Sequence, residues 1–179
     1  MLSVRKADPM MKIIKIIRGG SQNPLTLANG DKYDSAIEVI NCAGARVFRG
    51  EHVNTDPTVL HHGGLLAQGV YYYFIGMHKG TYAAPLLFTI TDTDRLVKIR
   101  QSGDLTLSER TLPSIVPNPV QGGRMIMTCI NIHKGGKYED LSEGCITIYP
   151  PEWDGFIACF EPGEIGYCEL IQTVEGRRK

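Results

Sequence analysis

One short stretch of the chain combines a histidine, a glycine-rich loop and a cysteine in an order that suits nucleophilic catalysis. From Ile130 the sequence reads INIHKGGKYEDLSEGCITI, so that one apolar run ends at His133 and another begins at Cys145. A thiol is mostly protonated at neutral pH, and a neighbouring imidazole can take its proton and leave a thiolate that attacks a carbonyl carbon. The pattern predicts Cys145 as a nucleophile and His133 as its base.

The residues around this pair predict how such a site is completed. Gly144 lets a substrate carbonyl approach, and the backbone N–H groups around Cys145 are expected to serve as an oxyanion hole. A backbone carbonyl just after the histidine, from Lys134 or Gly135, can orient the imidazole in place of an acidic side chain. Ser142 is expected to hydrogen-bond within the turn and hold it closed.

This stretch leaves alternatives open. Glu143 fits either a solvated loop carboxylate or a contact for a cationic or amine-bearing substrate. Taken one residue at a time, the stretch also fits an ordinary β-hairpin with a buried cysteine and a satisfied surface histidine. The combination of strand, histidine, glycine loop, Ser-x-Gly-Cys turn and strand favours catalysis.

The elements that must position these residues are predicted to be β-strands. Short runs rich in β-branched and aromatic residues alternate with Gly, Asn, Asp and Pro, which predicts a mostly β fold, a sandwich or open barrel with one or two short helices. We expect the strands that flank the loop to pair antiparallel, which would make His133 and Cys145 cross-strand neighbours. The predicted strands span residues 12–18, 36–40, 45–49, 70–77, 86–91, 96–100, 124–132, 145–149 and 165–173.

Three segments depart from the strand pattern. Residues 108–123 are rich in proline and glycine and are expected to form a loop or a strip of extended chain beside the core. Residues 151–160 carry apolar side chains at positions i, i+3, i+4 and i+7 behind a proline, which predicts a short amphipathic helix. Residues 1–11 are expected to form a flexible tail, and residues 12–179 a single domain.

Composition excludes several functional classes. Lys and Arg together number 19, as do Asp and Glu, so the chain has no net positive charge with which to neutralise nucleic acid. No apolar run reaches the roughly 18 residues of a membrane span. No apolar stretch of about 7–15 residues precedes a cleavage site, so the chain is expected to lack a signal peptide and to be made in the cytoplasm.

Five cysteines without C-x-x-C spacing argue against a disulfide framework and against structural zinc.

The remaining cysteines and histidines are expected to be structural. Cys129 and Cys159 are predicted to pack in the core. His61 and His62 are interpreted as loop residues and His78 as the end of a strand, because the ligand spacing of a zinc enzyme is missing. The sequence predicts neither a metal nor a cofactor.

The stretch over residues 133–148 resembles the L,D-transpeptidase catalytic domain, also called the YkuD-like domain. The signature of that family is a histidine followed by Ser/Thr-His-Gly-Cys, which His133, Ser142, Gly144 and Cys145 match. Upstream, GVYYYFIG over residues 69–76 looks like the Gly-x-Tyr/Phe strand of the family. A short helix and a closing strand follow the cysteine in the expected order.

The sequence departs from the family pattern at two positions near the nucleophile. Glu143 replaces the second histidine of the signature, and Thr147 stands where the family often has arginine. Neither departure changes the predicted nucleophile Cys145 or the predicted base His133. Both are expected to alter how the substrate is recognised.

The resemblance implies a fold of the L,D-transpeptidase type and a cysteine that attacks a peptide bond in peptidoglycan stem peptides or muropeptides. A thioester acyl-enzyme on Cys145 would be resolved by an amine or by water, giving transpeptidation, carboxypeptidase trimming or exchange of a D-amino acid. Without a leader, the chain fits a phage protein or a toxin delivered to the periplasm or cell wall. The alternative is a non-enzymatic β-domain, such as a phage structural or cell-wall-binding module.

Overall fold

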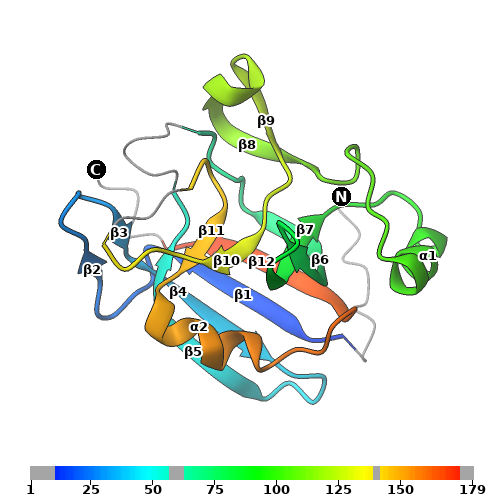
Figure 1. Ribbon diagram of the computed structural model, residues 1–179, viewed down its shortest axis with the longest axis horizontal. Helices are drawn as coiled ribbons and strands as arrows, with labels where there is room; N and C mark the ends of the chain where they lie inside the picture. Colours follow the sequence, from blue (N-terminus) through cyan, green and yellow to red (C-terminus); the bar gives the residue numbers. More distant parts are fainter. Residues whose placement is uncertain (1–10, 57–62, 139–141, 174–179) are drawn as a thin grey trace.

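The computed structural model describes residues 11–56, 63–138 and 142–173 of the chain (Figure 1). The flexible tail predicted over residues 1–11 lies outside the described residues except at Met11, which is buried. His61 and His62 lie outside them as well.

Eight strands form one sheet in the order β10-β11-β5-β4-β1-β12-β6-β7. The ends of the sheet meet where the Leu87 N–H donates to the Ile130 carbonyl at 3.0 Å and Leu86 bridges to Asn131. The sheet is therefore a nearly closed barrel, which confirms the predicted mostly β fold. Its strands are β1 (Ile13–Arg18), β4 (Ser35–Ile40), β5 (Arg46–Asn54), β6 (Gly69–His78), β7 (Tyr82–Phe88), β10 (Ile132–Lys134), β11 (Ile146–Ile148) and β12 (Ile165–Gln172).

The remaining elements flank this barrel (Figure 1). A hairpin of β8 (Thr111–Asn118) and β9 (Arg124–Thr128), joined by the 3₁₀ helix η1 (Pro119–Gln121), projects from it. Helix α2 (Pro150–Ile157) lies beside β5, and helix α1 (Asp94–Ser102) follows β7. A small ribbon pairs β2 (Leu25–Thr26) with β3 (Lys32–Tyr33). None of the helices in the described residues is long and apolar enough to cross a membrane.

The strand predicted over residues 96–100 is wrong, because this segment lies within helix α1. The spacing of its apolar residues fits both the period of a strand and that of a helix, and tertiary packing stabilises the helix. Ile99 alone in the helix is fully buried, in a cluster with Phe88 and Ile165. Gly103 then ends the helix in a left-handed conformation with φ 71°.

The proline-rich segment over residues 108–123, predicted as a loop or a strip of extended chain, is extended over Thr111–Asn118, where it forms strand β8. Pro113 lies opposite Ile126, and the pairing shifts register between Pro113 and Asn118. The other side of β8 bridges Ser114 to Leu66, and Pro113 takes part there through its carbonyl, which accepts the Ala67 N–H at 3.0 Å.

The predicted amphipathic helix is confirmed as α2, which packs an aromatic face on the barrel. Phe156 is fully buried, and its ring meets those of Phe48 and Phe160 edge-on. At the start of the helix the Glu152 carboxylate accepts the backbone N–H of His52 at 3.0 Å, which ties α2 to β5.

The predicted antiparallel pairing around the glycine loop is wrong, because β10 and β11 run parallel. Ile132 pairs with Ile146, so His133 lies opposite Thr147 rather than Cys145. Because the two strands run in the same direction, the chain must return between them to the level at which β10 begins. The segment is a crossover and not a hairpin.

We expect Phe156→Ala to lower the free energy of unfolding by about 3–5 kcal/mol, because it empties a fully buried aromatic site. Urea denaturation checks this. Val97→Ala on α1, where the side chain is 58% exposed, is the control and should change stability by less than about 0.5 kcal/mol. Similar losses in both variants would contradict the packing of α2.

Candidate active site

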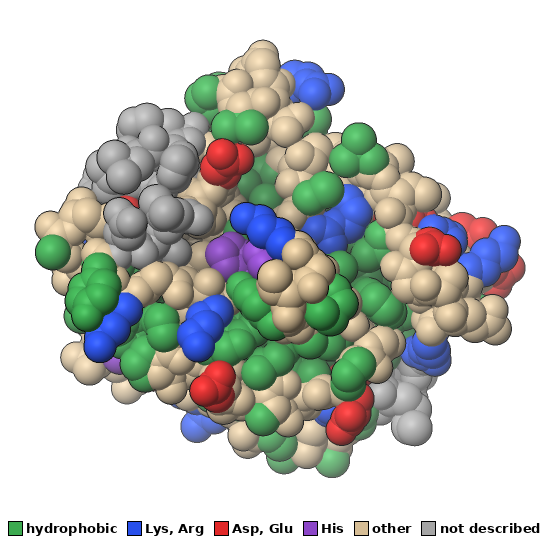
Figure 2. Space-filling view, in the orientation of Figure 1, with side chains coloured by type: hydrophobic (Ala, Val, Ile, Leu, Met, Phe, Trp, Pro, Cys, Tyr) green, Lys and Arg blue, Asp and Glu red, His purple; other side chains and the backbone are tan. Residues whose placement is uncertain are grey.

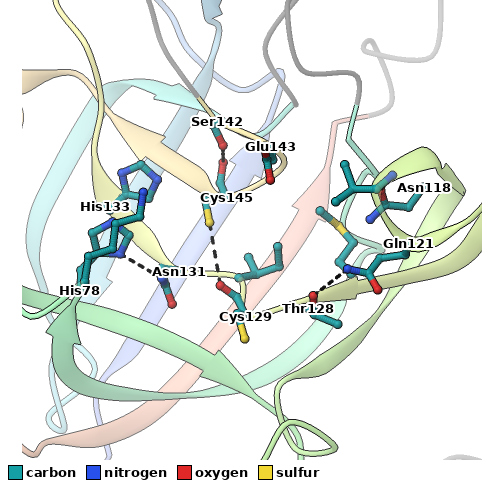
Figure 3. Close-up of a pocket in the computed structure, with 14 residues that line it drawn as sticks. His78, Asn118, Gln121, Thr128, Cys129, Asn131, His133, Ser142, Glu143 and Cys145 are labelled. Carbon is teal, nitrogen blue, oxygen red and sulfur yellow. Dashed lines mark hydrogen bonds between the residues drawn. The ribbon is translucent and has the colours of Figure 1, made fainter.

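A pocket of about 470 Å³ opens between the ends of β10 and β11, the turn after β6 and the β8–β9 hairpin. Cys145, His133, His78, Asn131, Cys129 and Glu143 are among the residues that line it (Figure 3). Figure 2 shows histidine side chains reaching the surface near the middle of this face, between basic and acidic groups. The pocket therefore gathers most of the residues singled out from the sequence.

The parallel pairing explains how Cys145 and His133 come to line one pocket. Cys145 precedes Ile146 and Asn131 precedes Ile132, so the register brings Cys145 beside Asn131. Side chains alternate along a strand, so His133 points to the same side as Asn131. Ile132 points to the other side and is fully buried. Both residues of the predicted pair thus line one pocket, through a different pairing from the one expected.

The Cys145 thiol is half-buried and is held as a thiol at rest. Its Sγ lies 4.0 Å from the Cys129 carbonyl oxygen, which accepts the S–H. Burial raises the pKa of Cys145, although a hydrogen bond from the Asn131 backbone and the charges of Arg110 and Lys79 oppose this. Deprotonation therefore requires a base that acts as the sulfur attacks.

His133 is oriented by a backbone carbonyl, as predicted. Its Nδ1 lies 2.9 Å from the carbonyl oxygen of Lys134. A carbonyl only accepts, so Nδ1 carries the proton and Nε2 carries the lone pair. Figure 3 shows the imidazole and the Cys145 side chain on the same side of the pocket. Lys134 contributes to this arrangement through its main chain.

Sequence analysis missed His78 as a member of this site. It ends β6, as expected, but its ring stacks on His133 with centroids 4.6 Å apart and an interplanar angle of 18°. Burial, with the nearby His133, Lys79 and Arg110, lowers the pKa of His78 to about 4. The one signal in the sequence is that His78-Lys-Gly repeats His133-Lys-Gly.

The Ser142 to Cys145 turn is closed by the predicted serine. Ser142 Oγ donates to the Cys145 carbonyl at 2.8 Å and accepts the Gly144 N–H at 3.2 Å. Gly144 has φ 127°, a conformation that favours glycine. A Cβ there would lie 3.1 Å from the Gly64 carbonyl oxygen and would require the end of the Met127 side chain to move. The Gly144 N–H is engaged by Ser142, so the predicted oxyanion hole does not include it.

Glu143 lies exposed at the rim of the pocket, where its carboxylate faces inward (Figure 3). Its backbone packs so closely on Gly63 that a Cβ at Gly63 would overlap it. Both sequence-based interpretations of Glu143, solvation and contact with a cationic substrate, fit this position.

The core prediction for Cys129 is wrong. Cys129 is exposed, lines the pocket and has φ 56°. The residue follows the end of β9, and its left-handed backbone turns the chain toward β10, which moves the side chain out of the core. Cys159 is half-buried at the edge of the core. Within the described residues, no group of three or more His, Cys, Asp or Glu side chains could hold a metal.

We expect Gly144→Ala to destabilise the protein by about 2–3 kcal/mol, because φ 127° is strained for a residue with a Cβ, which would also crowd the Gly64 carbonyl oxygen at 3.1 Å. Gly122→Ala is the matched control, since Gly122 also has positive φ, at 65°, but faces open space. It should cost about 1 kcal/mol. Equal losses in urea unfolding would show that the Gly64 carbonyl does not restrict the turn.

Acid should weaken the fold through His78. Between its ordinary pKa near 6.5 and its folded pKa of about 4, the unfolded chain binds the proton more readily. Stability therefore falls as the pH is lowered through this window. In urea midpoints at pH 7 and 4.5, His78→Phe should lose less stability on acidification than the unmodified protein. Identical pH dependence would contradict a buried neutral His78.

Comparison of the chain with family models, with curated proteins and with solved structures finds no match. Its function must therefore be inferred from the chemistry that the pocket supports.

Proposed function

We propose that the protein is a cysteine acyltransferase or hydrolase that forms a thioester acyl-enzyme on Cys145, with His133 as the base. The observation that carries this proposal is the common face of Asn131, His133 and Cys145 at the pocket. The Lys134 carbonyl holds the imidazole in the tautomer that a base needs.

The chemistry follows from the protonation states at rest. His133 Nε2 takes the proton of Cys145 as Sγ bonds to the carbonyl carbon of the substrate. The tetrahedral intermediate collapses when the C–N bond breaks, and the imidazolium returns the proton to the departing amine. An incoming amine or water then gives its proton to His133 as it attacks the thioester carbon, and the C–S bond breaks. The Cys145 sulfur leaves as a thiolate and takes the proton back from His133. Positive charge from Lys79 and Arg110 favours the anionic form of Cys145 in these steps.

We propose peptidoglycan stem peptides or muropeptides as substrates, on the resemblance of His133, Ser142, Gly144 and Cys145 to the L,D-transpeptidase signature. A pocket of about 470 Å³ has the size of a site for a short peptide segment. Transpeptidation, carboxypeptidase trimming and D-amino-acid exchange share the thioester. The proposed place of action is the periplasm or cell wall, reached by secretion or phage delivery.

One observation favours a second candidate, a non-enzymatic cell-wall-binding or phage structural domain. Burial raises the pKa of Cys145, so the thiol is less reactive at rest than an exposed cysteine of ordinary pKa. A domain that had kept the fold and lost turnover would show the same protonated thiol.

Labelling by electrophiles separates these candidates. We expect a carbapenem to acylate Cys145, and His133→Ala to slow this by about a hundredfold or more because the base is lost. Intact-mass and peptide mass spectrometry measure the rate at each cysteine. Exposed Cys42 and buried Cys168 are internal controls within the same molecule. If Cys145 reacts no faster than Cys42, the enzyme proposal fails.

Purified muropeptides then identify the reaction. Loss of a terminal D-alanine would indicate a carboxypeptidase, and new cross-links would indicate a transpeptidase. Cys145→Ser is the matched control, because it keeps the size of the side chain and replaces the nucleophile. Turnover that persists in Cys145→Ser would rule out the thioester.

A further inference from the structure

A chain of three polar side chains leads from the interior of the protein to the histidine pair. Buried Arg110 donates from Nη2 to the Asn131 Oδ1 at 2.6 Å and to the Ile130 carbonyl at 3.1 Å. Asn131 Nδ2 lies 2.9 Å from Nδ1 of His78. The chain ends where the His78 ring stacks on His133 (Figure 3).

The chemistry of each group fixes the direction of these hydrogen bonds. A guanidinium only donates, so the atom of Asn131 that faces Arg110 must be the carbonyl oxygen. The amide nitrogen of Asn131 therefore faces His78, and it also only donates. His78 Nδ1 must accept, which places the ring proton on Nε2. A proton on Nδ1 would bring two donors face to face.

We propose that Arg110 and Asn131 lock His78 in its neutral Nε2–H tautomer beneath His133, so that His78 is a positioning residue that directs the catalytic proton to His133. The lock follows from the hydrogen bonds alone. Only the description of His133 as the catalytic base rests on the proposed function.

Because the His78 ring stacks on His133, the protonation state of His78 affects that of His133. Two imidazolium rings with centroids 4.6 Å apart would repel each other, so a proton on His78 would oppose one on His133. The other titratable or charged groups around His78 are Lys79, Arg110 and Tyr82. Both cations disfavour charge on His78, in agreement with its lowered pKa. Of the stacked pair, His133 is the ring that gains the proton.

Asn131→Asp tests the lock with little change in shape. A carboxylate in place of the amide offers an acceptor to His78 Nδ1, so the ring should carry a proton there and become cationic at a higher pH than in the unmodified protein. We expect the pKa of His78 to rise by at least one unit, a tenfold change in proton affinity.

Long-range ¹H–¹⁵N correlation spectra of the ¹⁵N-labelled protein report the tautomer and the pKa of each ring. Gln121→Glu is the matched control, because it adds the same charge to the pocket, where Gln121 contacts Thr128. A purely structural role for Asn131 would leave the tautomer signature of His78 unchanged. A His78 pKa that rises no more in Asn131→Asp than in Gln121→Glu would overturn the proposal.

The spectrum of the unmodified protein gives a test that needs no variant. His78 must show the Nε2–H tautomer at pH 7, and the Nδ1–H tautomer would overturn the proposal even if Asn131→Asp fails to fold. These spectra are recorded without substrate, so they are independent of turnover. The expected tautomer together with an unreactive Cys145 would support the lock and overturn the proposed function alone.

Discussion

The parallel pairing of β10 with β11 is the constraint on which the candidate site depends. Its register joins Ile132 to Ile146 and buries both in the barrel. Because side chains alternate, the same register turns His133 and Cys145 toward the pocket. A slip of one residue would bury these polar groups and expose the isoleucines, which the hydrophobic effect opposes. Apolar packing thus holds the reactive groups in place.

Unusual backbone at two residues completes the pocket on either side of the sulfur. Cys129 has φ 56°, and this conformation leaves its carbonyl oxygen within 4.0 Å of Cys145 Sγ. Gly144 has φ 127° and lets the turn pass beneath Met127. The left-handed conformation is costly for Cys129 but not for a glycine, and residues strained in this way cluster at functional sites. Here they set the direction of the thiol and the approach to it.

Local patterns predicted the Ser142 turn, the backbone contact of His133 and most strands, because each depends on neighbours in the sequence. What could not be predicted depends on contacts between distant segments. The direction of β11 relative to β10 is decided by the path of the intervening loop, and the helix at Ile99 by packing on Phe88 and Ile165. His78 lies far from Cys145 in the sequence and is brought to it only because the barrel nearly closes.

A protonated Cys145 is compatible with catalysis when its base is positioned well. The thiolate of a high-pKa thiol is intrinsically the stronger nucleophile, so burial that suppresses ionisation also increases the reactivity of the anion once it forms. The gain is realised only if the proton leaves as the sulfur attacks, which requires a neutral imidazole at rest. In the proposed mechanism, the Lys134 carbonyl and the hydrogen bonds of Asn131 hold the two rings so that His133 would accept that proton. Coupled proton transfer and attack therefore fit the proposed enzyme better than a preformed thiolate that waits for substrate.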